Sequence, residues 1–164
     1  MLFSLSLFLS ASELHRCVFE ENYECFYEAL EHESVDIENS AGLTPLHVAI
    51  KKTDFKMAQI LLDRGADINH QDKNGNTPLI LAVKKKNLEL VSYVVLAGGD
   101  VNLQNEDGIT PLHQAAFSGN DKIVDFLLKA YADPKILNND GYSAYDFAMA
   151  KGFFSIAALI KMSM

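Results

Sequence analysis

The chain has 164 residues, of which 49% are hydrophobic and 22% are charged, a composition typical of a folded domain with a sizeable core. Its formal net charge of -8 argues against binding to nucleic acid, which favours an excess of basic residues in a continuous stripe. The negative charge is concentrated between positions 13 and 38, where nine acidic residues accompany Arg16 alone. The rest of the chain is neutral, so the overall charge is a poor guide to a binding face.

The first segment, residues 1–11, is apolar from Leu2 to Leu9 apart from two serines. It is too short to span a bilayer as a helix. We expect a hydrophobic lead-in that packs on the first helices of a cytoplasmic protein. The alternative is a weak signal peptide and export, favoured by the small residues 10–12 but not by the lack of Lys or Arg before the apolar stretch.

A short motif recurs along the chain at a constant spacing. Gly-x-Thr-Pro-Leu begins at Gly42, Gly75 and Gly108, and a degraded fourth copy begins at Gly141. The hydroxyl residues of successive copies are 33 positions apart, at Thr44, Thr77, Thr110 and Ser143. Similarity at a fixed period predicts a stack of repeated units.

Each copy of the motif can be explained as a turn followed by a helix. Asn or Asp three residues before the glycine favours a type I turn that ends in glycine. Thr or Ser then caps the helix, and Pro takes its first position. Apolar residues three apart, such as Leu46 and Ala49, line one face of this first helix.

A second apolar helix follows in each unit. It ends at Gly65 and Gly98 in two successive units, where glycine suits a left-handed C-cap. Tyr131 occupies the same position in the next unit. The helix end at Tyr131 is therefore either strained or closed differently.

The 33-residue period and the Thr-Pro-Leu-His core resemble the ankyrin repeat, over nearly everything from about residue 12 onward. The resemblance implies an all-α ankyrin-repeat solenoid of about five helix-turn-helix units linked by hairpin-like turns. It also implies a protein-binding domain, residues 12–164, with a concave groove lined by turn tips and first helices. The expected units are 12–38, 39–71, 72–104, 105–137 and 138–164.

The first and last units are the least regular. Cys17 and Cys25 align with core positions, and two cysteines make neither a disulfide framework nor a zinc site. We expect small buried hydrophobic side chains in a reduced compartment. Glutamates on the outer face of the first unit would keep that end soluble. The last unit is rich in apolar residues, so we expect it to be covered by the N-terminal segment or a second copy, or to be a contact surface.

The groove positions of the central units carry lysines and then an apolar strip. Phe117 is the sharpest candidate, because large aromatic side chains at exposed positions are often binding hot spots. A partner segment with acidic residues leading to an aliphatic or aromatic anchor would fit, although solvated lysines at helix ends also favour the helix dipole. The candidate partner-binding residues are Lys51, Lys52, Lys73, Asn76, Lys84, Lys85, Glu106, Ile109, Phe117 and Tyr142.

The sequence offers no arrangement typical of an enzyme, such as a nucleophile with a base or a glycine loop for phosphate. We therefore expect no catalytic residues, no cofactor and no small-molecule substrate. His15, His47 and His113 belong to the Leu-His motif, and we expect them to hydrogen-bond neighbouring turns rather than bind a metal.

Two functions stay open within the binding class, and a third reading is purely structural. The first is a scaffold or adaptor that engages a partner in the groove. The second is an inhibitor or immunity protein that neutralises a toxin or enzyme, with the acidic first repeat facing a basic surface. The third is a subunit of a longer repeat array that stacks on the last unit.

Overall fold

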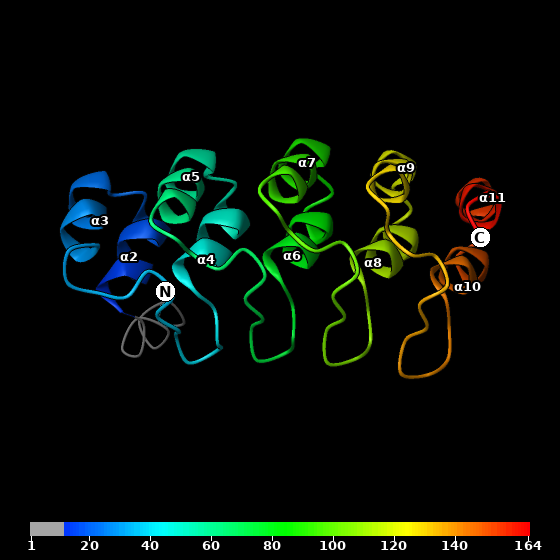
Figure 1. The fold of residues 1–164 in the computed structure, drawn as a ribbon, viewed down its shortest axis with the longest axis horizontal. Helices are drawn as coiled ribbons and strands as arrows, with labels where there is room; N and C mark the ends of the chain where they lie inside the picture. Colours follow the sequence, from blue (N-terminus) through cyan, green and yellow to red (C-terminus); the bar gives the residue numbers. More distant parts are fainter. Residues whose placement is uncertain (1–11) are drawn as a thin grey trace, which may run out of the picture.

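The computed structural model describes residues 12–164, and the predictions about residues 1–11 lie outside this part. The described helices form five pairs that follow one another along a single line, with a turn projecting between successive pairs (Figure 1). The all-α repeat solenoid predicted from the sequence is confirmed. The pairs are α2 (Glu13–Glu20) with α3 (Tyr23–Ala29), α4 (Pro45–Lys52) with α5 (Phe55–Asp63), α6 (Pro78–Lys84) with α7 (Leu88–Leu96), α8 (Pro111–Ser118) with α9 (Asp121–Lys129), and α10 (Ala144–Ala150) with α11 (Phe154–Met162).

The first helix of each regular unit begins as the motif predicts. The hydroxyl oxygens of Thr44, Thr77, Thr110 and Ser143 each accept a hydrogen bond from the backbone N–H three residues later. Proline opens three of these four helices, where its missing N–H would have had no intrahelical partner. The caps are local, so they set the helix starts without help from the rest of the fold.

Successive turn tips pack directly on one another. The backbone N–H of Lys73 donates to the Ala41 carbonyl at 3.0 Å, and that of Glu106 donates to the Asn74 carbonyl at 3.0 Å. Gly75 has a φ of 72°, and a Cβ there would lie 2.6 Å from the backbone nitrogen of Glu106. Glycine is therefore required both by the left-handed turn and by the close approach of the next tip.

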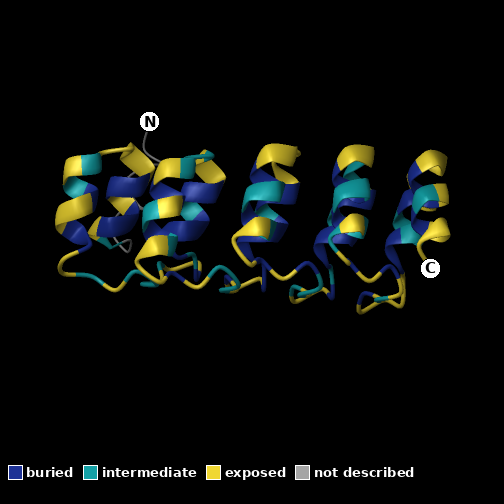
Figure 2. Cartoon of the chain, turned by 45° about the horizontal axis from the view of Figure 1, so that its top comes forward, coloured by how far each residue is buried: buried dark blue, intermediate teal, exposed yellow. Residues whose placement is uncertain are grey.

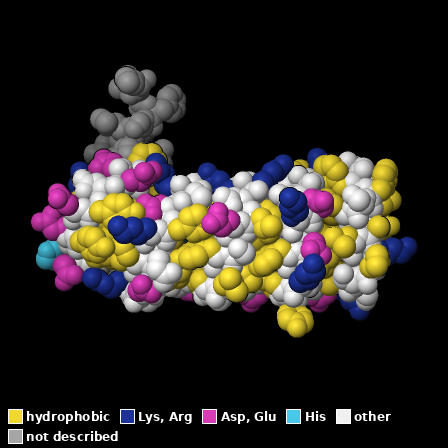
Figure 3. Space-filling model, turned by 90° about the horizontal axis from the view of Figure 1, so that it is seen from above, with side chains coloured by type: hydrophobic (Ala, Val, Ile, Leu, Met, Phe, Trp, Pro, Cys, Tyr) yellow, Lys and Arg dark blue, Asp and Glu magenta, His cyan; other side chains and the backbone are white. Residues whose placement is uncertain are grey.

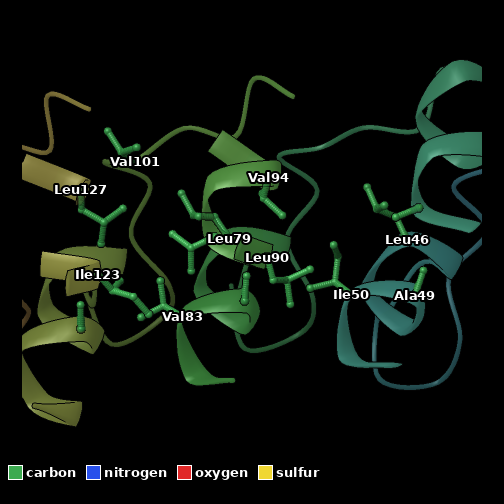
Figure 4. Close-up of a cluster of buried hydrophobic side chains, with 14 of the residues drawn as sticks. Leu46, Ala49, Ile50, Leu79, Val83, Leu90, Val94, Val101, Ile123 and Leu127 are labelled. Carbon is green, nitrogen blue, oxygen red and sulfur yellow. The ribbon is translucent and has the colours of Figure 1, made fainter. Parts of the chain in front are cut away.

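The hydrophobic core runs along the stack between the two rows of helices. Buried residues face neighbouring helices, and exposed residues lie on the outer faces (Figure 2). First-helix side chains such as Leu46 and Leu79 meet second-helix side chains such as Leu90, Val94 and Leu127 in this strip (Figure 4). Each unit buries its apolar surface against its neighbours, so no unit has a separate core.

Three histidines link neighbouring units, as predicted. Burial lowers the pKa of His47 to about 4, and burial also lowers the pKa values of His15 and His113. The backbone N–H of Thr44 donates to Nδ1 of His47 at 3.1 Å, which leaves the proton on Nε2 to reach the next unit. The Nε2-to-carbonyl pairs are His15 with Leu43 at 2.6 Å, His47 with Asn76 at 3.2 Å and His113 with Tyr142 at 3.0 Å.

The third unit lacks this link. Ile80 takes the histidine position and is fully buried. An isoleucine side chain cannot donate to a carbonyl, so the junction between the third and fourth units has no ring-to-carbonyl bond.

The prediction that the cysteines occupy core positions is confirmed for Cys17, which is fully buried, but the prediction of free thiols is wrong. Cys17 on α2 and Cys25 on α3 form a disulfide, with their Cα atoms 5.5 Å apart. Their counterparts Ala49 and Met57 are both fully buried within the second helix pair. The alignment of both cysteines with core positions of one helix pair was the available signal, because a disulfide needs a short Cα separation and side chains that point toward each other.

Tyr131 takes the strained option of the two predicted for it. Its φ of 66° lies in the left-handed region, and its side chain is 89% exposed. The backbone closes as in the second unit: Ala132 N–H donates to the Leu127 carbonyl at 2.9 Å, and Ala66 N–H donates to the Leu61 carbonyl at 3.0 Å. A non-glycine residue in this conformation costs on the order of 1 kcal/mol.

Candidate functional site

The predicted contact residues lie on the turn tips and on the last turns of the first helices. We call the surface formed by these elements the inner surface. The first helices are the ones nearer the projecting turns (Figure 1). In the third unit, tip and helix end meet, because Nζ of Lys84 donates to Oδ1 of Asn76 at 2.9 Å. The inner surface comprises residues 40–43 and 51–52, 73–76 and 84–85, 106–109 and 117–118, and 139–142 and 150–151.

The lysines of the inner surface differ in how they are held. Lys51, Lys73 and Lys85 are exposed, and their ammonium groups form no ion pair with residues 12–164. Lys52 forms an ion pair with Glu21 at 2.9 Å and lies 5.0 Å from the centroid of the Phe19 ring. The charge of Lys52 is thus directed toward the first unit, whereas the other three remain available to a partner.

Asn76 does not lie at the surface as the sequence predicted. It is only 6% exposed, and its amide donates to the Asp72 carboxylate at 3.2 and 3.3 Å. Its Oδ1 accepts from Lys84 and, at 3.3 Å, from Nδ2 of Asn105. Asn76 therefore acts as a positioning residue that holds the Lys84 ammonium over the inner surface. The position of Asn76 in the repeat indicated that it lies at a turn tip. It did not indicate that the side chain points inward.

Phe117 is exposed and yet held in place. Its side chain is 45% exposed, and its ring makes an edge contact with Phe147 at a centroid distance of 6.0 Å. Nζ of Lys151 lies 4.1 Å from the centroid of the Phe117 ring, a cation–π geometry. Phe147 was missed from the sequence, although it stands where Val48 and Leu81 stand in earlier units. This aromatic departure from the repeat was the available signal.

The remaining predicted residues lie on the tips. Tyr142 is 56% exposed and Ile109 is half-buried, so both present apolar surface. Glu106 is exposed, and its carbonyl accepts a hydrogen bond from Nδ2 of Asn139 at 2.7 Å. The ring contacts of Phe117 are with the last unit, so the apolar part of the inner surface extends beyond the predicted strip.

The acidic residues of the first unit are largely engaged within the protein. The Glu33 carboxylate accepts from the backbone N–H groups of Glu13 and Leu14 at 3.2 and 2.9 Å, which caps the start of α2. Three exposed acidic residues have no such partner among residues 12–164, namely Glu20, Glu24 and Glu28. The engaged ones are Glu13, Glu21, Glu31, Glu33, Asp36 and Glu38.

The sequence of the chain matches a family model for ankyrin repeats in three copies, over residues 14–104 and 84–163. The chain belongs to the ankyrin-repeat family. No curated protein is detectably similar to it in sequence. Ankyrin repeats generally bind other proteins and are typically not enzymes. Every helix among residues 12–164 is too short or too polar to cross a membrane.

Proposed function

We propose that this ankyrin-repeat protein is a non-enzymatic adaptor that binds a partner protein at the inner surface, with Phe117 as the main anchor. The observation that carries the proposal is an exposed aromatic ring held between Phe147 and Lys151. A side chain ordered before binding loses little conformational entropy when a partner covers it. Aromatic anchors of this kind dominate the binding energy of many interfaces.

The charges beside this anchor favour an acidic partner segment. Lys51, Lys73 and Lys85 are exposed, and Lys84 is positioned by Asn76. Carboxylates of a partner would meet these ammonium groups before its apolar side chain reaches Phe117. Complementary charges of this kind contribute to association rate and specificity more than to affinity.

The test is to compare binding of the wild-type chain and Phe117→Ala to a partner captured from the native organism. We expect the substitution to weaken binding by about 1 to 3 kcal/mol while lowering stability by no more than about 1 kcal/mol, from the lost contacts with Phe147 and Lys151. Calorimetric titration and thermal melting measure the two quantities. Phe154→Ala is a matched control, because Phe154 is 66% exposed but lies on α11, outside the inner surface. Equal losses for both variants would contradict the proposed anchor.

The inhibitor alternative predicts a different response. A basic toxin or enzyme bound at the first unit would lose affinity steeply in high salt, because exposed charges are screened. It would also be insensitive to Phe117→Ala. Those two results together would assign binding to the acidic face that carries Glu20, Glu24 and Glu28 instead of to the inner surface.

A further inference from the structure

A cleft of about 490 Å³ opens between the last turns of α5 and α7, and none of its lining residues belongs to the inner surface. Figure 3 looks down on the row of second helices, where hydrophobic side chains gather in patches with single charged residues between them. The cleft is lined by Gln59, Leu62, Asp63, Ala66, Ile68, Tyr93, Leu96 and Ala97.

The apolar side of the cleft includes a departure from the repeat. Leu96 is 84% exposed, whereas its counterparts in the neighbouring units are the charged residues Asp63 and Lys129. The fold thus tolerates a charged side chain at this position, so folding does not require leucine there. Together with the half-buried Leu62 and Ile68, Leu96 presents aliphatic surface to solvent.

The other side of the cleft is electronegative. Asp63 is the last residue of α5, where the helix dipole already places partial negative charge, and no Lys or Arg among residues 12–164 pairs with it. Gln59 Nε2 donates to the Asp63 carboxylate at 2.8 Å, and the Tyr93 hydroxyl donates to Gln59 Oε1 at 3.3 Å. These bonds orient the carboxylate but leave its charge uncompensated. The natural complement is a cation.

The next unit also carries an exposed aromatic side chain near the end of its second helix. Tyr131, at 89% exposure, is the counterpart of Gly98, which directly follows the lining residue Ala97. An aromatic side chain is kept there in a left-handed conformation that glycine would adopt without strain. A peptide segment bound in the cleft could extend toward this side chain, which a small molecule could not do.

We propose that this cleft is a second protein-binding site, which takes a partner segment carrying a lysine or arginine next to an aliphatic or aromatic side chain. The basic group would pair with Asp63, and the apolar side chain would pack against Leu96 and Tyr93. The site is separate from the inner surface, so the protein would hold two segments of opposite charge at once. The proposal of this second site does not depend on the anchor role of Phe117.

The experiment uses a random peptide library displayed on phage and selected against the whole chain. We expect enriched peptides with a basic residue beside an apolar one. Fluorescence anisotropy of the enriched peptides then measures affinity for each variant. Leu96→Ser should weaken binding roughly tenfold or more, as expected for a hot spot. Asp63→Asn should weaken binding at low salt and reduce its salt dependence.

Two variants serve as controls. Leu88→Ser removes an exposed leucine from the same helix, outside the cleft, and Phe117→Ala removes the inner-surface anchor. Both should leave affinity unchanged, and thermal melting should show that Leu96→Ser folds normally. The proposal is overturned if no basic and apolar peptides are enriched. It is equally overturned if the enriched peptides bind Leu96→Ser and Asp63→Asn as well as wild type, or are lost with Phe117→Ala.

Discussion

The two ends of the stack are closed in different ways. The first unit is joined internally by the disulfide between Cys17 and Cys25. Its acidic side chains reach the second unit through Glu21 with Lys52 at 2.9 Å, Glu31 with Arg64 at 3.6 Å and Glu38 with His70 at 3.0 Å. No ion pair among residues 12–164 joins the last unit to the fourth.

The last unit instead leaves apolar surface open. Met149 is 41% exposed, while its counterparts in the four earlier units are fully buried by the unit that follows each of them. Lys161, however, replaces the half-buried Leu128 of the fourth unit. The C-terminal face is therefore only partly adapted to water. The comparison shows that many acidic side chains at the N-terminal end make contacts within the protein. The apolar side chains at the C-terminal end remain exposed and could contact a partner.

The largest expected loss of stability comes from truncating a side chain in the middle of the stack, which serves as the reference for the ends. Leu79→Ala should destabilise the protein by about 2 to 5 kcal/mol, because Leu79 is 1% exposed and its removal leaves a cavity. Met149→Ala, a truncation at the open C-terminal face, should cost less than about 1 kcal/mol. Urea unfolding measures both. A large cost at Met149 would mean that something covers this face.

A smaller loss is expected when the disulfide is removed. The double variant Cys17→Ala with Cys25→Met copies the residues Ala49 and Met57 of the second unit, so it should pack without a new cavity. It should lower stability by about 2.5 kcal/mol, because the unfolded chain regains the freedom of a short closed loop. Hydrogen exchange should accelerate in α2 and α3 while α10 and α11 keep their protection. Equal acceleration at both ends would show that the disulfide is not a local closure.

Acidification should weaken the junctions that buried histidines make in both halves of the stack. The folded chain keeps His47 neutral down to about pH 4, whereas the unfolded chain protonates it near 6.5. Below 6.5 the unfolded state binds more protons, so stability falls as the pH drops toward 4, by about 2 kcal/mol near pH 5 for His47 alone. Hydrogen bonds from Ser143 lower the pKa of Asp146 in the last unit. The stability that ionised Asp146 contributes is therefore lost only as the pH falls below about 3.8.

Urea unfolding at neutral pH and near pH 5 measures the histidine effect. His47→Ile is the matched control, because Ile80 occupies the same position in the third unit. Its stability should depend less on pH in this range. An unchanged pH dependence would assign the effect to other groups.

The sequence predicted local features better than contacts between units. Helix starts followed from Thr44 and its counterparts, because a cap needs only residues within one turn. The inward side chain of Asn76 and the packing of Phe117 on Phe147 depend on how one unit meets the next. The cysteine pair lies within one unit, but it was missed because it depends on the distance between two helices rather than on residues within one turn.

Isoleucine at position 80 distinguishes one junction of the solenoid from the others. The junction between the third and fourth units has no ring-to-carbonyl bond, although Glu106 N–H donates to the Asn74 carbonyl and Asn105 Nδ2 donates to Asn76 Oδ1 across it. Lys85 and Phe117 lie on opposite sides of this junction. A partner bound to both residues would add contacts across the junction that lacks the histidine bond.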